Sequence, residues 1–114
     1  MSEKKLTVSF TCGSTTEADL IRNAVNRYRH VITERGDDPR NYAPANEEGA
    51  GFGWDAIQRA AREMSGGSVT HMSRRMATAI RTALDDKAKG ITSPEARALA
   101  LNLSERLRTL AGGA

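Results

Sequence analysis

The chain has 114 residues, a length at which one domain can bury a core without metals or disulfides. Its single cysteine, Cys12, excludes an internal disulfide, and the absence of a long apolar run predicts a cytoplasmic protein that does not enter a membrane. The net charge of +3, from 17 basic and 14 acidic residues, permits a nucleic-acid partner without requiring one. We expect one mainly α domain over residues 1–114, with about four helices and one short N-terminal strand.

Residues 5–12 alternate between apolar and polar side chains, which is typical of a half-buried strand. Leu6, Val8, Phe10 and Cys12 would face the core. No second segment of the sequence has comparable β character, and an unpaired strand leaves its backbone groups without partners. The simplest partner is the same strand of a second copy, which predicts a homodimer.

A paired strand that precedes a helix is similar to the opening of the ribbon-helix-helix repressors, in which strands from two chains form one antiparallel ribbon. The similarity covers about the first thirty residues and places Thr7, Ser9 and Thr11 on the outer face of the ribbon. It implies a pairing between chains through this strand. The sequence departs from that family after the strand, because the next helix is longer and a second helix does not follow promptly.

Residues 14–17 form a Ser-x-x-Glu capping box, which predicts a helix from residue 15 or 16 to about residue 35, with Gly36 at its end. Its apolar positions recur at helical spacing and form a buried stripe of Leu20, Ile21, Ala24, Val25, Tyr28, Val31 and Ile32. A Gly-Ser-Thr-Thr turn before a helix also resembles an anion site. The lysine that a Walker phosphate loop requires is absent, so we assign no nucleotide site.

Residues 37–53 form an acidic segment rich in glycine and proline, which predicts a loop. Tyr42 and Phe52 lie in this loop and Trp54 directly follows it. Two interpretations remain open. Phe52 and Trp54 could attach the end of the loop to the core, or the three aromatic residues could bind a partner protein, where such residues often dominate the affinity.

The helical region 55–110 begins with a short helix over residues 55–64, capped by Asp55 and ended by Ser65, Gly66 and Gly67. Residues 68–84 predict the most amphipathic helix of the chain. Its apolar face would contain Val69, Met72, Met76, Ile80, Ala83 and Leu84. Its polar face would contain His71, Arg74, Arg75, Thr78, Arg81 and Thr82.

Two helices joined by a tight turn have the outline of a helix-turn-helix, with residues 68–84 as the recognition helix. Any pair of packed helices shares this outline. A last helix should start at Ser93 and Pro94 and carry an apolar stripe to residue 110. That stripe suits the core or a helix-to-helix dimer contact.

No set of residues predicts catalysis, a cofactor or a metal site. Cys12 has no neighbouring base in the sequence, and His30 and His71 fall on the polar faces of two different predicted helices. The paired acids lie in loops or at helix ends, where a general acid and base with differently shifted pKa values are uncommon. We therefore expect a binding protein and not an enzyme.

Positive charge gathers in residues 54–90 and negative charge in residues 37–53. Arginine binds phosphate through paired hydrogen bonds, and the arginines of residues 68–84 have few acids at helical spacing. The sequence thus predicts a small nucleic-acid-binding regulator, for DNA or RNA. The predicted contact residues are Arg59, Arg62, His71, Arg74, Arg75, Thr78 and Arg81.

The alternative is a protein-binding factor. It would act either as an inhibitor of a larger nucleic-acid machine, of the phage or plasmid anti-defence type, or as a small helical subunit of a ribonucleoprotein complex. In that case Tyr42, Phe52 and Trp54 would bind the partner.

Overall fold

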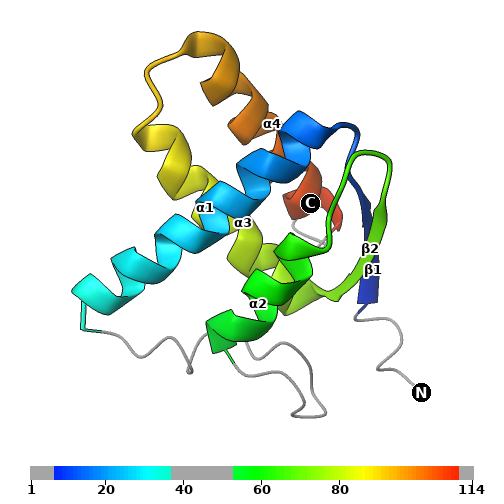
Figure 1. Ribbon diagram of the computed structural model, residues 1–114, viewed down its shortest axis with the longest axis horizontal. Coiled ribbons are helices and arrows are strands. Elements are labelled where there is room, and N and C mark those ends of the chain that lie inside the picture. The colour runs from blue at the N-terminus through cyan, green and yellow to red at the C-terminus, as the bar shows by residue number, and fades with distance from the viewer. Residues whose placement is uncertain (1–6, 37–52, 111–114) are drawn as a thin grey trace.

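The computed structural model describes residues 7–36 and 53–110. Over these residues the chain forms four helices and a two-stranded antiparallel sheet (Figure 1). The elements in chain order are β1 (Thr7–Thr11), α1 (Thr15–Glu34), α2 (Gly53–Arg62), β2 (Val69–Ser73), α3 (Arg74–Lys89) and α4 (Pro94–Leu110). The prediction of a mainly α fold with about four helices and an N-terminal strand is confirmed.

The predicted capping residues define the ends of α1 and α4. Ser14 Oγ accepts a hydrogen bond from the Glu17 amide at 3.2 Å, and Glu17 Oε1 accepts one from the Gly13 amide at 2.8 Å. Gly36, with φ of +89°, follows the last turn of α1. Ser93 Oγ accepts from the Ala96 amide at 3.3 Å at the start of α4.

The partner of β1 is β2 of the same chain, and the pairing runs from Thr7 opposite Ser73 to Thr11 opposite Val69. The prediction of one helix over residues 68–84 is therefore wrong for residues 69–73. Val69 and Thr70 are β-branched and follow a Gly-Gly turn, which favours an extended chain, and pairing satisfies the backbone of both strands. The helix begins at Arg74, where Ser73 Oγ accepts from the Met76 amide at 3.0 Å.

Two earlier expectations change with this strand. A helix-turn-helix is absent here, because β2 separates α2 from α3. The argument for a dimer paired through residues 5–12 also loses its premise, since β1 already has a partner strand. Lys5 and Leu6 lie outside the described residues.

Glycine is needed in the turn that leads into β2. The Gly67 amide donates to Cys12 O at 2.8 Å from a backbone with φ of +85°. A Cβ at Gly66 would lie 2.9 Å from the Thr15 amide nitrogen. The turn therefore packs closely against the start of α1, which holds β2 beside β1.

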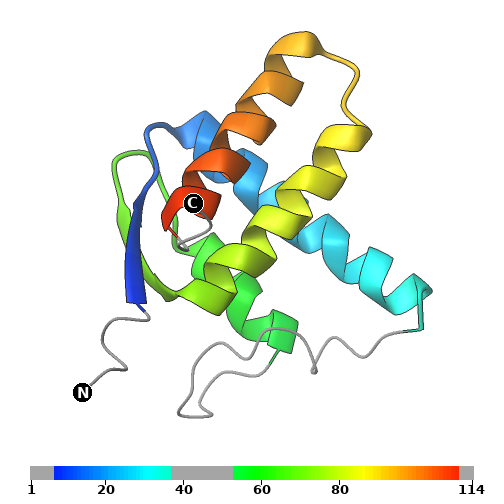
Figure 2. The ribbon, with the colours of Figure 1, turned by 180° about the vertical axis from the view of Figure 1, so that it is seen from behind.

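The core lies between α1, α2 and the antiparallel pair α3 and α4, which Figure 2 shows side by side. Trp54 is fully buried, its ring centroid lies 5.4 Å from that of Tyr28, and its Nε1 donates to Val25 O at 2.7 Å. Trp54 thus attaches the start of α2 to α1, and the interpretation in which it binds a partner protein is wrong. Tyr42, Phe52 and the rest of residues 37–52 lie outside the described residues.

Among the described helices, none combines the length and the apolar character needed to cross a membrane.

Candidate functional site

The β1–β2 sheet has one face in the core and one facing outward, because side chains alternate along a strand. Phe10 and Met72 are buried on the inner face, whereas Ser9 and His71 are exposed on the outer face. Ser9 Oγ lies 2.9 Å from His71 Nδ1 in a cross-strand hydrogen bond. Val69 is 54% exposed, so its predicted place in the core is wrong, since strand alternation replaces helical spacing.

Arg74 and Arg75 are the first two residues of α3 and directly follow the sheet. Both are exposed, and within the described residues neither takes part in an ion pair or a side-chain hydrogen bond. They lie at the positive end of the helix dipole, where basic side chains are unfavourable, and the first turn of α3 contains no acid. Arg74 and Arg75 are therefore not explained by a contribution to the stability of α3.

Arg59 and Arg62 are exposed in the last turn of α2, a helix that lies beside the start of α3 (Figure 1). A basic residue is favourable at this end of a helix. The pKa of Asp55 is lowered mainly by its hydrogen bond from Arg29, and the charge of Arg59 lowers it further. Arg59 and Arg62 therefore have a structural role at the end of α2, and they also lie on a helix beside the start of α3.

Thr78 is exposed one turn into α3, but Arg81 is only partly exposed, and its Nε lies 3.9 Å from Asp85 Oδ2. The pKa of Glu105 is lowered first by a hydrogen bond from Arg108 and also by the charge of Arg81. The prediction that Arg81 lacks nearby acids is wrong.

We use the name basic end for the outward face of the sheet together with the first turn of α3: Ser9, Thr11, Val69, His71, Arg74 and Arg75.

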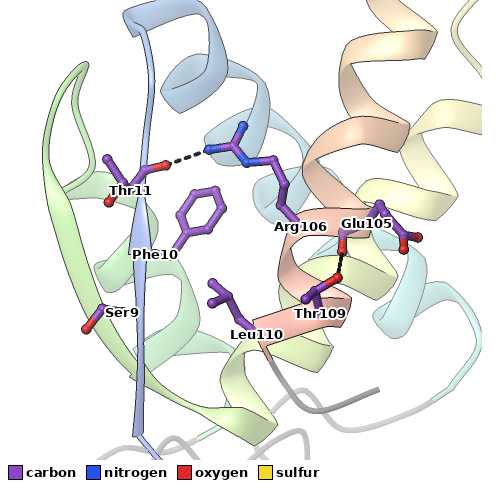
Figure 3. Close-up of a pocket in the computed structure, with 7 residues that line it drawn as sticks. All are labelled: Ser9, Phe10, Thr11, Glu105, Arg106, Thr109 and Leu110. Carbon is purple, nitrogen blue, oxygen red and sulfur yellow. Dashed lines mark hydrogen bonds between the residues drawn. The ribbon is translucent and has the colours of Figure 1, made fainter. Parts of the chain in front are cut away.

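A second surface was not predicted from the sequence. A groove of about 360 Å³ lies between β1 and the C-terminal end of α4 (Figure 3), and its walls are Ser9, Phe10, Thr11, Glu105, Arg106, Thr109 and Leu110. Arg106 Nη2 donates to Thr11 O at 2.7 Å, and its guanidinium carbon lies 5.1 Å from the Phe10 ring centroid. Arg106 Nη1 also lies 3.2 Å from both carboxylate oxygens of Glu17, so it joins α4 to β1 and α1.

The groove borders the edge of β1 that is not paired with β2. The Cys12 amide donates toward β2, to Ser68 O at 3.0 Å, whereas Thr11 O accepts from Arg106 on the opposite side. Backbone groups alternate between the two sides of a strand, so the amide and carbonyl of Ser9 point the same way as those of Thr11. This edge can therefore receive a further strand.

Within residues 7–36 and 53–110, no three His, Cys, Asp or Glu residues are placed to share a metal ion. Cys12 is buried, and burial together with the charge of Glu17 raises the pKa of its thiol, which keeps it protonated. Comparison of the chain with protein-family models, with curated proteins and with solved structures finds no match.

Proposed function

We propose that the protein is a small cytoplasmic regulator that binds nucleic acid without catalysis, and that Arg74 and Arg75 contact phosphate groups. The observation that supports this most is the position of these two side chains, which are exposed at the positive end of α3 and pair with no other described residue. A guanidinium group matches phosphate oxygens with two parallel hydrogen bonds. The free amides of a helix N-terminus favour the same anion.

The test is a double variant, Arg74→Ala with Arg75→Ala, measured against random duplex and single-stranded oligonucleotides over a series of salt concentrations. Each lost phosphate contact should lower the slope of log affinity against log salt by roughly one unit on duplex DNA. The matched control is Lys87→Ala with Lys89→Ala, which removes the same charge from the other end of α3. Wild-type protein that does not bind at low salt, or an equal loss in the control, contradicts the proposal.

A second function is favoured by the groove beside β1. An extended segment of a partner protein could add a strand to β1, with main-chain hydrogen bonds to Ser9 and an apolar side chain near Phe10 and Leu110. The protein would then be a protein-binding factor, either an inhibitor of a larger nucleic-acid machine or a subunit of a ribonucleoprotein complex.

The same edge is the place where we propose a homodimer contact, because a second copy of β1 could pair there. Ser9→Pro removes an amide that points to the groove and leaves the β1–β2 hydrogen bonds in place, whereas Ser9→Ala removes only the hydroxyl. Loss of self-association or of partner binding in Ser9→Pro but not in Ser9→Ala would support edge pairing. Sedimentation of the wild-type chain as a monomer at micromolar concentration rules out the homodimer.

A further inference from the structure

We infer that the outward face of the β1–β2 sheet contacts base edges in the major groove of duplex DNA, while Arg74 and Arg75 contact the adjacent backbone. This inference rests on the proposed nucleic-acid function and names its partner more closely. The phosphate contacts would give affinity for any sequence, and the sheet would give preference for one. His71 and Ser9 are the residues to which we assign this second role.

The shape of the sheet supports this assignment. The major groove of B-DNA is about 12 Å wide and admits a two-stranded ribbon, whereas the major groove of A-form RNA is too narrow for side chains to reach the bases. Figures 1 and 2 show the sheet at one edge of the molecule, with the described helices on one side of it. Ser9, Thr11, Val69 and His71 are all exposed, so no described element covers the other side.

The side chains on this face suit base edges. Serine and threonine hydroxyls can donate to or accept from any base, and an exposed valine can contact the methyl group of thymine. The hydrogen bond between Ser9 Oγ and His71 Nδ1 orients the imidazole and leaves Nε2 for an external partner. Val69, at 54% exposed, is the most exposed large hydrophobic residue in the described part of the chain, which a contact on this face would explain.

The charge of the basic end complements DNA. The sequences of β1 and β2, TVSFT and VTHMS, contain no acid that would repel the backbone. Arg74 directly follows Ser73, the last residue of β2, so a ribbon in the groove brings the first turn of α3 to its phosphate wall. The outward face of the sheet thus has hydroxyl, imidazole and apolar groups, and it is followed directly in the chain by two exposed cations that pair with no other described residue.

The test is selection from a random duplex DNA library, followed by affinity measurements on the enriched and on a scrambled sequence. His71→Ala should weaken binding to the enriched sequence roughly 5- to 100-fold, as for one lost base contact, with little change on the scrambled duplex. Its salt slope should stay as in the wild type. His30→Ala is the matched control, because His30 is exposed on α1.

Ser9→Ala provides a second and milder variant, which keeps the imidazole and removes the hydroxyl that orients it. Its preference for the enriched sequence should fall while its melting temperature stays close to that of the wild type. The inference is overturned if wild-type protein enriches no sequence, or if folded His71→Ala and Ser9→Ala variants keep the full preference. The proposed function fails separately, if Arg74→Ala with Arg75→Ala leaves affinity for the scrambled duplex unchanged.

Discussion

The arginines of α1 and α4 differ from those at the start of α3 in whether the described fold gives them an acidic partner. On α1 and α4, five arginines pair with carboxylates, namely Arg22 with Asp19, Arg27 with Asp86, Arg29 with Asp55, Arg106 with Glu17 and Arg108 with Glu105. At the start of α3, Arg74 and Arg75 have no such partner among the described residues. Residues of one type are thus paired in one part of this small protein and left without an acidic partner among the described residues in another.

The difference shows how little a net charge says about a binding surface. Arg27 joins α1 to α3, Arg29 joins α1 to α2, and Arg106 joins α4 to both α1 and β1. Their charge is used within the fold. Only the cations without an internal partner remain available to an external anion, and in the described chain two of these occupy the unfavourable end of α3.

The largest expected change in the free energy of unfolding comes from the buried face of α3. It is the reference against which the smaller effects of the arginine variants are compared. Ile80 is fully buried, and Ile80→Ala should lower the free energy of unfolding by about 2 to 5 kcal/mol because it leaves a cavity. Thr78 is exposed on the same helix, and Thr78→Ala should change it by less than about 0.5 kcal/mol. Denaturant unfolding measures both, and an equal loss would mean that α3 is oriented differently.

The two groups of arginines can be separated by stability. Arg106→Ala removes the bonds to Thr11 O and Glu17 and the contact with the Phe10 ring, and it should cost about 1 to 2 kcal/mol, given the partial exposure of the pair. Arg74→Ala should cost less than about 0.5 kcal/mol. Similar losses in the two variants would contradict the division into internal and available cations.

The distinction between the internally paired arginines and Arg74 and Arg75 also depends on the residue at which α3 begins. Ser73 caps α3, so Ser73→Ala should cost about 1 kcal/mol in thermal or denaturant unfolding. If residues 68–84 formed one continuous helix, alanine at this interior position would be neutral or stabilising. An unchanged stability would therefore support the continuous helix predicted from the sequence, in which Arg74 and Arg75 do not lie at a helix end.

The sequence predicted those parts of the fold whose signals are local. The capping residues Ser14 and Ser93 and the apolar spacing of α1 and α4 determine helix ends and buried faces from a few neighbouring residues. The start of α3 could not be found in this way, because Met72 and Met76 fit the spacing of a helix and hide the change at Ser73. The missed signals were the pair Val69 and Thr70 after two glycines, and the need of β1 for a partner.

The candidate site could be predicted only in part. Arg74 and Arg75 are visible in the sequence as basic residues without acids nearby, and the structure keeps them exposed. The acid near Arg81 could have been found, because Asp85 follows it at the i+4 spacing, but the predicted helix ended at residue 84, one residue too early; Glu105 comes from α4 and gives no local signal. The bond between Ser9 and His71 and the groove beside β1 join segments that are far apart in the sequence, so no local pattern predicts them.

The smallest expected effect sharpens the comparison most, because stability and binding should change in opposite directions. Arg75→Glu places an acid at the positive end of the α3 dipole and should raise the free energy of unfolding by about 0.3 to 1 kcal/mol at low salt. Lys89→Glu makes the same charge change at the negative end and should lower it by a similar amount. If Arg75 contacts phosphate, Arg75→Glu should also bind nucleic acid far more weakly than Lys89→Glu does. A more stable variant that loses binding would show that Arg75 is kept for a ligand at the expense of the helix, and a stabilised variant with unchanged binding would leave the arginine without the role proposed for it.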